Sequence, residues 1–296
     1  MLDADAFILA DGARLPYRAW LPEGRPEAVI LALHGFNDSR NAWLLAAPVF
    51  VAAGFALYAP DQRGFGATEG RGRWPGADAL AVDAAEMARL LRARHPDSKL
   101  VLMGESMGGA VLMHLATSGF APADVSYVLL APAVWGRARM NVLLRATLFV
   151  ASVFVPGMYV SRPPPVVKIV ASDNRDALTR LSNDPLTIKQ TRVGTTAGLV
   201  DLMDIALAAG ASFRAPALFL YGGHDDLVPK AATRQMWRAL PEGPRRLAYY
   251  ASGYHLMLCD LGRAAPLGDI ISWIKAPGGA LPSGAEGAVE GFLQEG

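Results

Sequence analysis

The residues with the clearest chemical potential are Gly104-Glu105-Ser106-Met107-Gly108, which match the pattern G-x-S-x-G. They follow the apolar run KLVLMG and open the helical run GGAVLMHLATSG. A strand, a sharp turn and a helix are the context in which such a serine is exposed above a sheet as a nucleophile. This context is more specific than the bare pattern, which occurs by chance in glycine-rich chains. We therefore predict that Ser106 attacks an acyl carbon.

A serine hydroxyl needs a base to accept its proton, and the base needs a carboxylate to orient it. Hydrolases built on this turn carry the three groups in the order serine, acid, histidine. Of the five histidines, two precede Ser106, one lies on the helix after it and one comes too early to follow an acid. His255 is therefore the predicted base. Asp225 and Asp226, at the end of the apolar run ALFLYGG, are the two candidate acids.

The negative charge that develops on the substrate oxygen needs two hydrogen-bond donors. One is normally the backbone N–H after the nucleophile, and the other comes from a loop near the start of the sheet. Met107 supplies the first N–H group. Phe36 is predicted to supply the second, because Gly35 after the run AVILALH lets the backbone turn inward.

Short apolar runs predict the strands that position these groups, at residues 28–34, 54–60, 99–104, 125–132, 217–223 and 245–251. Helical patterns at 41–53, 76–94 and 107–118 alternate with them. This alternation is typical of an α/β protein with a mostly parallel sheet and helices on both faces.

The alternation stops after Pro132 and resumes near Ala217, and an interval of this length predicts an inserted cap. We therefore expect a first core segment at 1–135, a helical cap at 136–211 and a second core segment at 212–276. Residues 277–296 are rich in Gly, Pro and Ala and are expected to form a flexible tail.

The composition excludes several classes of protein. Lys and Arg number 28 against 27 Asp and Glu, a balance that provides no basic surface for nucleic acid. A single cysteine, Cys259, can form neither an internal disulfide nor a cysteine-based zinc site. The histidines are too scattered to predict a metal site, and no cofactor is implied. Because Asp3 and Asp5 stand where a secretory signal carries positive charge, we expect a cytoplasmic protein.

The most apolar stretch, residues 141–160, is interrupted by Arg145 and Pro156 and is too short to span a membrane. It predicts either an ordinary buried helix or a cap helix that contacts substrate or a membrane surface. On the second interpretation, Leu148, Phe149 and Val153 are the candidate contacts to an acyl chain.

The motifs LALHGFNDS, YAPDQRGFGATEG, GESMGG, YGGHDDLVP and SGYH occur in a familiar order and spacing. Over roughly residues 15–275 the chain resembles the monoacylglycerol lipase and lysophospholipase-like branch of the α/β hydrolases, of serine aminopeptidase S33 type. The resemblance implies an eight-stranded α/β-hydrolase sheet with a helical cap inserted after the sixth strand. It also implies the triad Ser106, Asp225 and His255, since related enzymes carry the acid four residues before a proline, and the oxyanion donors Phe36 and Met107.

Two residues depart from the pattern of this branch, because many members have histidine at the position of Glu105 and serine at that of Thr68. The expected reaction is hydrolysis of a monoacylglycerol or lysophospholipid through an acyl-enzyme on Ser106. A general carboxylesterase is the alternative, as is an acyltransferase, perhydrolase or amidase with the same triad. A non-catalytic binding protein is disfavoured because all three triad candidates are present.

Overall fold

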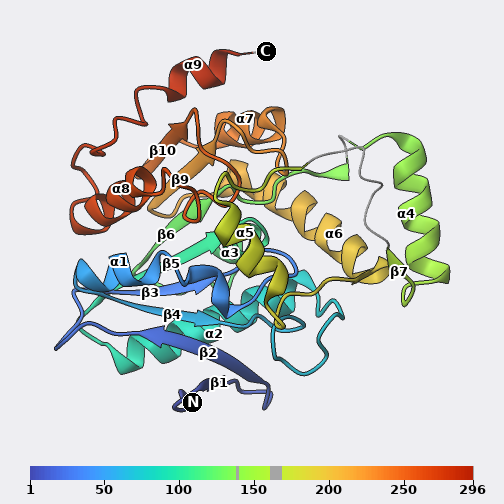
Figure 1. Ribbon diagram of the computed structural model, residues 1–296, viewed down its shortest axis with the longest axis horizontal. Coiled ribbons are helices and arrows are strands. Elements are labelled where there is room, and N and C mark those ends of the chain that lie inside the picture. The colour runs from blue at the N-terminus through green and yellow to red at the C-terminus, as the bar shows by residue number, and fades with distance from the viewer. Residues whose placement is uncertain (138–139, 161–168, 296) are drawn as a thin grey trace.

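The protein is built around one eight-stranded sheet with the order β1-β2-β4-β3-β5-β6-β9-β10 (Figure 1). The computed structural model describes residues 1–137, 140–160 and 169–295. The strands from β4 to β10 pair in parallel, whereas β1 and β2 are antiparallel to their neighbours. The sheet confirms the predicted α/β-hydrolase fold.

Each of the six predicted apolar runs contains a strand. The strands are β1 (Ala6–Ile8), β2 (Arg14–Trp20), β3 (Ala28–Leu33), β4 (Phe55–Pro60), β5 (Lys99–Glu105), β6 (Val125–Leu130), β9 (Ala217–Gly222) and β10 (Arg245–Tyr250). All residues of β3, β4 and β9 are buried, because a parallel sheet has both faces covered and its strands are therefore continuously apolar. The residue pattern did not predict β1 and β2, since β2 is largely half-exposed and mixes charged with apolar residues.

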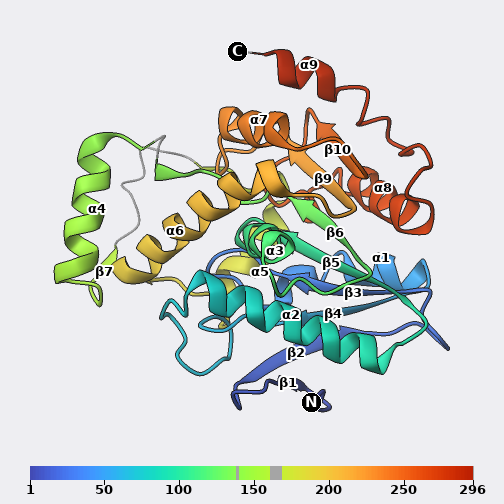
Figure 2. The same ribbon diagram turned by 180° about the vertical axis from the view of Figure 1, so that it is seen from behind.

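Helices cover both faces of this sheet. They are α1 (Ala47–Ala52), α2 (Ala77–Arg94), α3 (Met107–Thr117), α7 (Lys230–Ala239), α8 (Ala264–Lys275) and α9 (Val289–Gln294), with a short 3-10 helix η1 (Arg40–Trp43). Helices α1 and α8 lie on the face toward the viewer in Figure 1, and α2 and α3 on the face toward the viewer in Figure 2. The helix expected at 41–53 is divided into η1 and α1, and Pro48 stands in the first turn of α1, where its missing N–H costs nothing.

A cap stands between β6 and β9. It contains α4 (Val142–Phe154), α5 (Arg175–Asn183), α6 (Val193–Ala209), a two-stranded sheet of β7 (Tyr159–Val160) and β8 (Thr191–Arg192), and the 3-10 helix η3 (Gly210–Ser212). Figures 1 and 2 show α4 at the far end of the molecule from α8, beyond one end of α6. The boundaries predicted at 136 and 211 stay a prediction, because α6 also packs on α3 of the core.

In the part of the chain that the structure describes, one segment, Val193–Ser212, is long and apolar enough to cross a membrane. Half of its most apolar stretch is buried inside the protein. Burial of this kind is what a core helix shows, and the packing of α6 on α3 explains its apolar composition.

The flexible C-terminal tail expected from composition stays a prediction, and the described part of this segment contacts the sheet. Residues 277–295 pack along the edge of the sheet, and Arg246 of β10 donates from Nε to Glu286 at 2.7 Å. Phe292 of α9 is 1% exposed and stacks on Tyr249, with ring centroids 4.4 Å apart. The composition is rich in Gly and Ala, but these few anchoring side chains supply the contacts that composition does not reveal.

Candidate active site

The predicted nucleophile, Ser106, stands in the turn between β5 and α3. Its backbone has φ 52° and ψ −112°, a conformation that L-residues rarely adopt. Glycines make the turn possible, because a Cβ atom at Gly104 would clash with the backbone of Gly108, and one at Gly108 would clash with Leu33. Strain of this kind persists where the surrounding structure enforces it, often at a catalytic residue.

His255 and Asp225 form a buried pair. Nδ1 of His255 lies 2.8 Å from Oδ2 of Asp225, and both side chains are almost completely buried. Oδ1 of Asp225 accepts hydrogen bonds from the backbone N–H groups of Leu227 at 2.8 Å and Val228 at 2.9 Å. With Nδ1 engaged, Nε2 is the ring nitrogen left to act as a base.

Asp226, the alternative acid, lies elsewhere. Its Oδ2 accepts from the backbone N–H of Val170 at 3.2 Å, in an exposed setting. The structure therefore brings Asp225, and not Asp226, to His255. Burial alone would lower the pKa of His255, but the charge and hydrogen bond of Asp225 oppose it and the net pKa is raised above 6.5.

The loop predicted to carry an oxyanion donor packs directly against the nucleophile. A Cβ atom on Gly35 would lie 3.5 Å from Cβ of Ser106. Within the described residues, the backbone N–H groups of Phe36 and Met107 donate no hydrogen bond to protein atoms. Two free donors beside a strained serine are the arrangement that stabilises a tetrahedral oxyanion.

Ser106 and His255 open into a cavity of about 820 Å³ between the core and the cap. Its walls are mostly apolar side chains of the cap, among them Leu144, Leu148 and Met203. A few polar groups, Asn37, Asp38 and Thr187, line the same cavity. An apolar space with a few polar groups beside a nucleophile is the usual form of a site for a small amphipathic substrate.

The serine aminopeptidase, S33, family model matches residues 24–262. The chain belongs to this family. It is 26% identical over 279 residues to a monoacylglycerol lipase of Mycolicibacterium smegmatis, a match that covers 91% of this chain and 95% of the relative. It is 25% identical over 281 residues to the monoglyceride lipase of Mus musculus, covering 92% and 90%.

Among solved structures, the monoacylglycerol lipase of Paleococcus ferrophilus superposes on this S33 chain with a TM-score of 0.73. The two chains are 22% identical, and the match covers 88% of this chain and 98% of the other. These relatives confirm the resemblance that the sequence motifs indicated.

The three predicted acyl contacts stay a prediction, and one of them lies on the cavity wall. Leu148 lines the cavity, but Phe149 and Val153 are 69% and 56% exposed and lie on the outer side of α4. The helix is apolar around most of its circumference, so its sequence does not show which side faces the substrate. The inner side is formed instead by Leu144, Thr147, Leu148 and Ala151, at the three- and four-residue spacing of one helix face.

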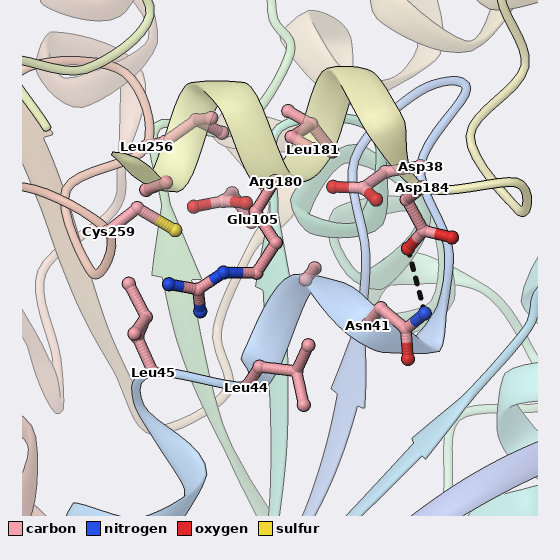
Figure 3. Close-up of a pocket in the computed structure, with 12 residues that line it drawn as sticks. Asp38, Asn41, Leu44, Leu45, Glu105, Arg180, Leu181, Asp184, Leu256 and Cys259 are labelled. Carbon is pink, nitrogen blue, oxygen red and sulfur yellow. Dashed lines mark hydrogen bonds between the residues drawn. The ribbon is translucent and has the colours of Figure 1, made fainter. Parts of the chain in front are cut away.

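Glu105, where this chain departs from many relatives, is a buried acid directly behind the nucleophile. It is 4% exposed and lines a second cavity, of about 50 Å³, under α5 (Figure 3). Arg180 and Asp38 line the same space. Within the described residues, the Glu105 carboxyl makes no hydrogen bond or ion pair. Burial raises the pKa of Glu105 to about 8 and that of Asp38 to about 7.

Sequence reasoning missed the polar groups of the main cavity. Oδ1 of Asn37 and Oγ1 of Thr187 are buried and have no hydrogen-bond partner among the described residues. Asn37 lies next to the predicted donor Phe36, so its position in the motif HGFND was the available signal. Thr187 is contributed by the cap, where no motif marked it. Among the described residues, no group of three or more His, Cys, Asp or Glu side chains is placed to hold a metal ion.

Proposed function

We propose that the protein hydrolyses monoacyl esters that join a medium or long acyl chain to a small polar alcohol. The observation that carries this proposal is the apolar cavity of about 820 Å³ that opens on Ser106 and His255. Its size is that of sites that enclose most of a small molecule. The chain is a carboxylic ester hydrolase, and the proposal concerns its substrate and the role of each residue.

In the proposed reaction, Oγ of Ser106 attacks the ester carbon while Nε2 of His255 accepts the serine proton. The backbone N–H groups of Phe36 and Met107 bind the oxyanion. The intermediate collapses, the imidazolium gives its proton to the departing alcohol, and an acyl-serine remains. Water then attacks the acyl carbon while His255 accepts its proton; the bond to Oγ breaks, the imidazolium returns the proton to Ser106, and the fatty acid leaves. Asp225 keeps the imidazole in the required tautomer and stabilises its positive charge.

The cavity supports this substrate class because its lining combines an apolar part with a few polar side chains. Cap side chains such as Leu144 and Leu148 provide apolar surface for an acyl chain. The polar side chains of Asn37, Asp38 and Thr187 line the same cavity and provide a polar setting for the alcohol. Relatives named monoacylglycerol lipase in Mycolicibacterium smegmatis and monoglyceride lipase in Mus musculus agree with a lipid monoester.

The test is fatty-acid release from monoacylglycerols of increasing chain length, from a lysophospholipid, and from matched p-nitrophenyl esters and anilides. We expect rates on the esters to rise toward medium and long chains, and Ser106→Ala to lose at least about 10⁴-fold in kcat. A preference for two- to four-carbon acyl groups would replace the proposal with a general carboxylesterase. Faster anilide than ester cleavage would favour an amidase, and full activity of Ser106→Ala would exclude the mechanism.

We also propose that the outer side of α4 rests on a membrane surface that presents the substrate. Six of its apolar side chains are more than half exposed: Val142, Leu143, Phe149, Val150, Val153 and Phe154. Arg145 is the only charged residue of this helix. An exposed apolar side on one helix is the feature by which a protein lies in a membrane interface. A cytoplasmic location, expected from the sequence, stays a prediction.

Sedimentation with phosphatidylcholine vesicles tests this contact. The double variant Phe149→Ser/Phe154→Ser is expected to weaken partitioning by about tenfold or more, because each phenylalanine contributes apolar area. Hydrolysis of a soluble short ester should stay unchanged. Leu21→Ser, at an exposed leucine just after β2, is the matched control. Equal partitioning of the two variants would contradict a membrane contact through α4.

A further inference from the structure

The turn that carries the Phe36 N–H is held by the cap. Residues 35–38 form a tight turn, in which the Asp38 N–H donates to the Gly35 carbonyl at 3.3 Å. Asn37 occupies this turn at φ 64°, a left-handed conformation that asparagine tolerates better than most residues. The carbonyl of Asn37 accepts from the Ile188 N–H at 2.8 Å. Its side-chain Nδ2 donates to Oγ1 of Thr191 at 2.6 Å.

Both partners of Asn37 belong to the cap segment between α5 and α6, and this segment is anchored on the core at further points. Asn41 donates to Asp184 at 2.7 Å, the bond drawn as a dashed line in Figure 3. Arg71 donates to three consecutive backbone carbonyls, beginning with Pro185 at 2.8 Å. The segment therefore has a fixed position from which it can hold the turn.

Thr191 also connects the turn to the outer part of the cap. It lies in β8, where it pairs with Val160 of β7, the strand that follows α4. A chain of direct contacts thus runs from the end of α4 through β7 and β8 to Asn37, and covalently to Phe36. A displaced oxyanion donor is costly, since loss of one donor typically lowers kcat by about 10²–10³-fold.

We propose that Asn37 is a positioning residue through which the cap, by way of Thr191, holds the Phe36 N–H where the oxyanion forms. The inference rests on the proposed function of Ser106. It assigns the cap a part in the chemical step, in addition to enclosing the acyl chain. Turnover of a substrate too short to reach the cap should then depend on a cap threonine.

The experiment compares kcat and KM for p-nitrophenyl acetate, whose acyl group is too small to fill the cavity under the cap. Thr191→Val removes the acceptor oxygen at nearly constant volume, and we expect kcat to fall about 5- to 50-fold with KM changed less than about twofold. Thr191→Ser restores the hydroxyl and should recover most of kcat. Thr179→Val, at an exposed threonine of α5, is the control.

A second variant makes the test independent of the stability of Thr191→Val. Asn37→Gly keeps the turn, because glycine adopts this φ freely, and removes the side-chain amide whose Nδ2 contacts Thr191. It should reproduce the loss in kcat, and the double variant should lose no more than either single one, since both remove the same contact.

Additive losses, or a loss confined to KM of long-chain esters, would overturn the coupling and leave the proposed function intact. A folded Thr191→Val protein with the kcat of wild type would also overturn the coupling and leave the proposed function intact. If the wild-type protein shows no Ser106-dependent ester hydrolysis, the proposed function and this inference both fail. Melting curves followed by circular dichroism establish that each variant is folded.

Discussion

Replacing Glu105 with glutamine should stabilise the protein, and the gain should grow with pH. Glu105 is 4% exposed and has no hydrogen-bond partner among the described residues. Asp38, Arg180 and Asp184 line its small cavity, together with Cys259. The charges of His255, Asp225 and Asp260 also act on it. Burial dominates these influences and raises the Glu105 pKa from 4.5 to about 8.

The sign of the effect follows from proton linkage. The folded protein binds the Glu105 proton more tightly than the unfolded chain, so wild-type stability is lost as pH rises from 4.5 toward about 8. One pKa unit corresponds to about 1.4 kcal/mol, which makes the cost at most about 2 kcal/mol at pH 6 and about 4 kcal/mol at pH 8. Relaxation and water in the cavity reduce these values. We therefore expect the advantage of Glu105→Gln to increase by about 1–2 kcal/mol from pH 6 to pH 8.

Urea unfolding of both proteins at pH 6, 7 and 8, followed by tryptophan fluorescence, measures this difference. The burial of the glutamine amide adds an offset that does not depend on pH, and Asp38, whose charge raises the Glu105 pKa, titrates in both proteins. Glu23→Gln, at an exposed glutamate, is the control and should show no such trend. An offset between Glu105→Gln and wild type that stays constant, or shrinks, as pH rises would refute the assignment of Glu105 as a buried neutral acid.

Three further changes test the site and the fold. Asp225→Asn should lower kcat about 10⁴-fold and move the acid limb of kcat/KM to lower pH, because Asp225 raises the pKa of His255. Asp226→Asn should change neither kcat nor the position of this limb. Equal losses in the two variants would reopen the choice of acid. Phe292→Ala should cost about 3–5 kcal/mol in urea unfolding, since the ring is buried, whereas no change would mean that the tail is loose after all. Leu148→Trp should slow hydrolysis of long-chain esters and spare p-nitrophenyl acetate, and an equal effect on both would place the acyl chain elsewhere.

The residue pattern was sufficient for the interior of the fold. The inner strands β3, β4, β5, β6 and β9 were predictable because a strand buried on both faces is apolar throughout. The turn at Ser106 was predictable because its glycines and its strand–helix context are local. The strands β1 and β2 were not marked by apolar runs, because an antiparallel edge of the sheet needs less apolar surface.

The candidate site was predictable only as a set of residue types in a given order. The sequence alone left Asp225 and Asp226 as alternatives, and the bond of Asp225 to His255 depends on how the loop after β9 turns. The two sides of α4 are both apolar, so partial burial of Leu148 and exposure of Phe149 depend on what packs against the helix.

By itself, the sequence determined the local features of this protein: the strained serine turn, the order of the triad candidates and the apolar strands that carry them. Only the tertiary structure decided which side chains meet across long separations. Asn37 and Thr191 are 154 residues apart and still share a hydrogen bond. Phe292 finds its aromatic partners in a segment whose composition predicts disorder. Local patterns record the backbone preferences of neighbouring residues, whereas contacts of this kind arise only when the whole core has brought distant segments together.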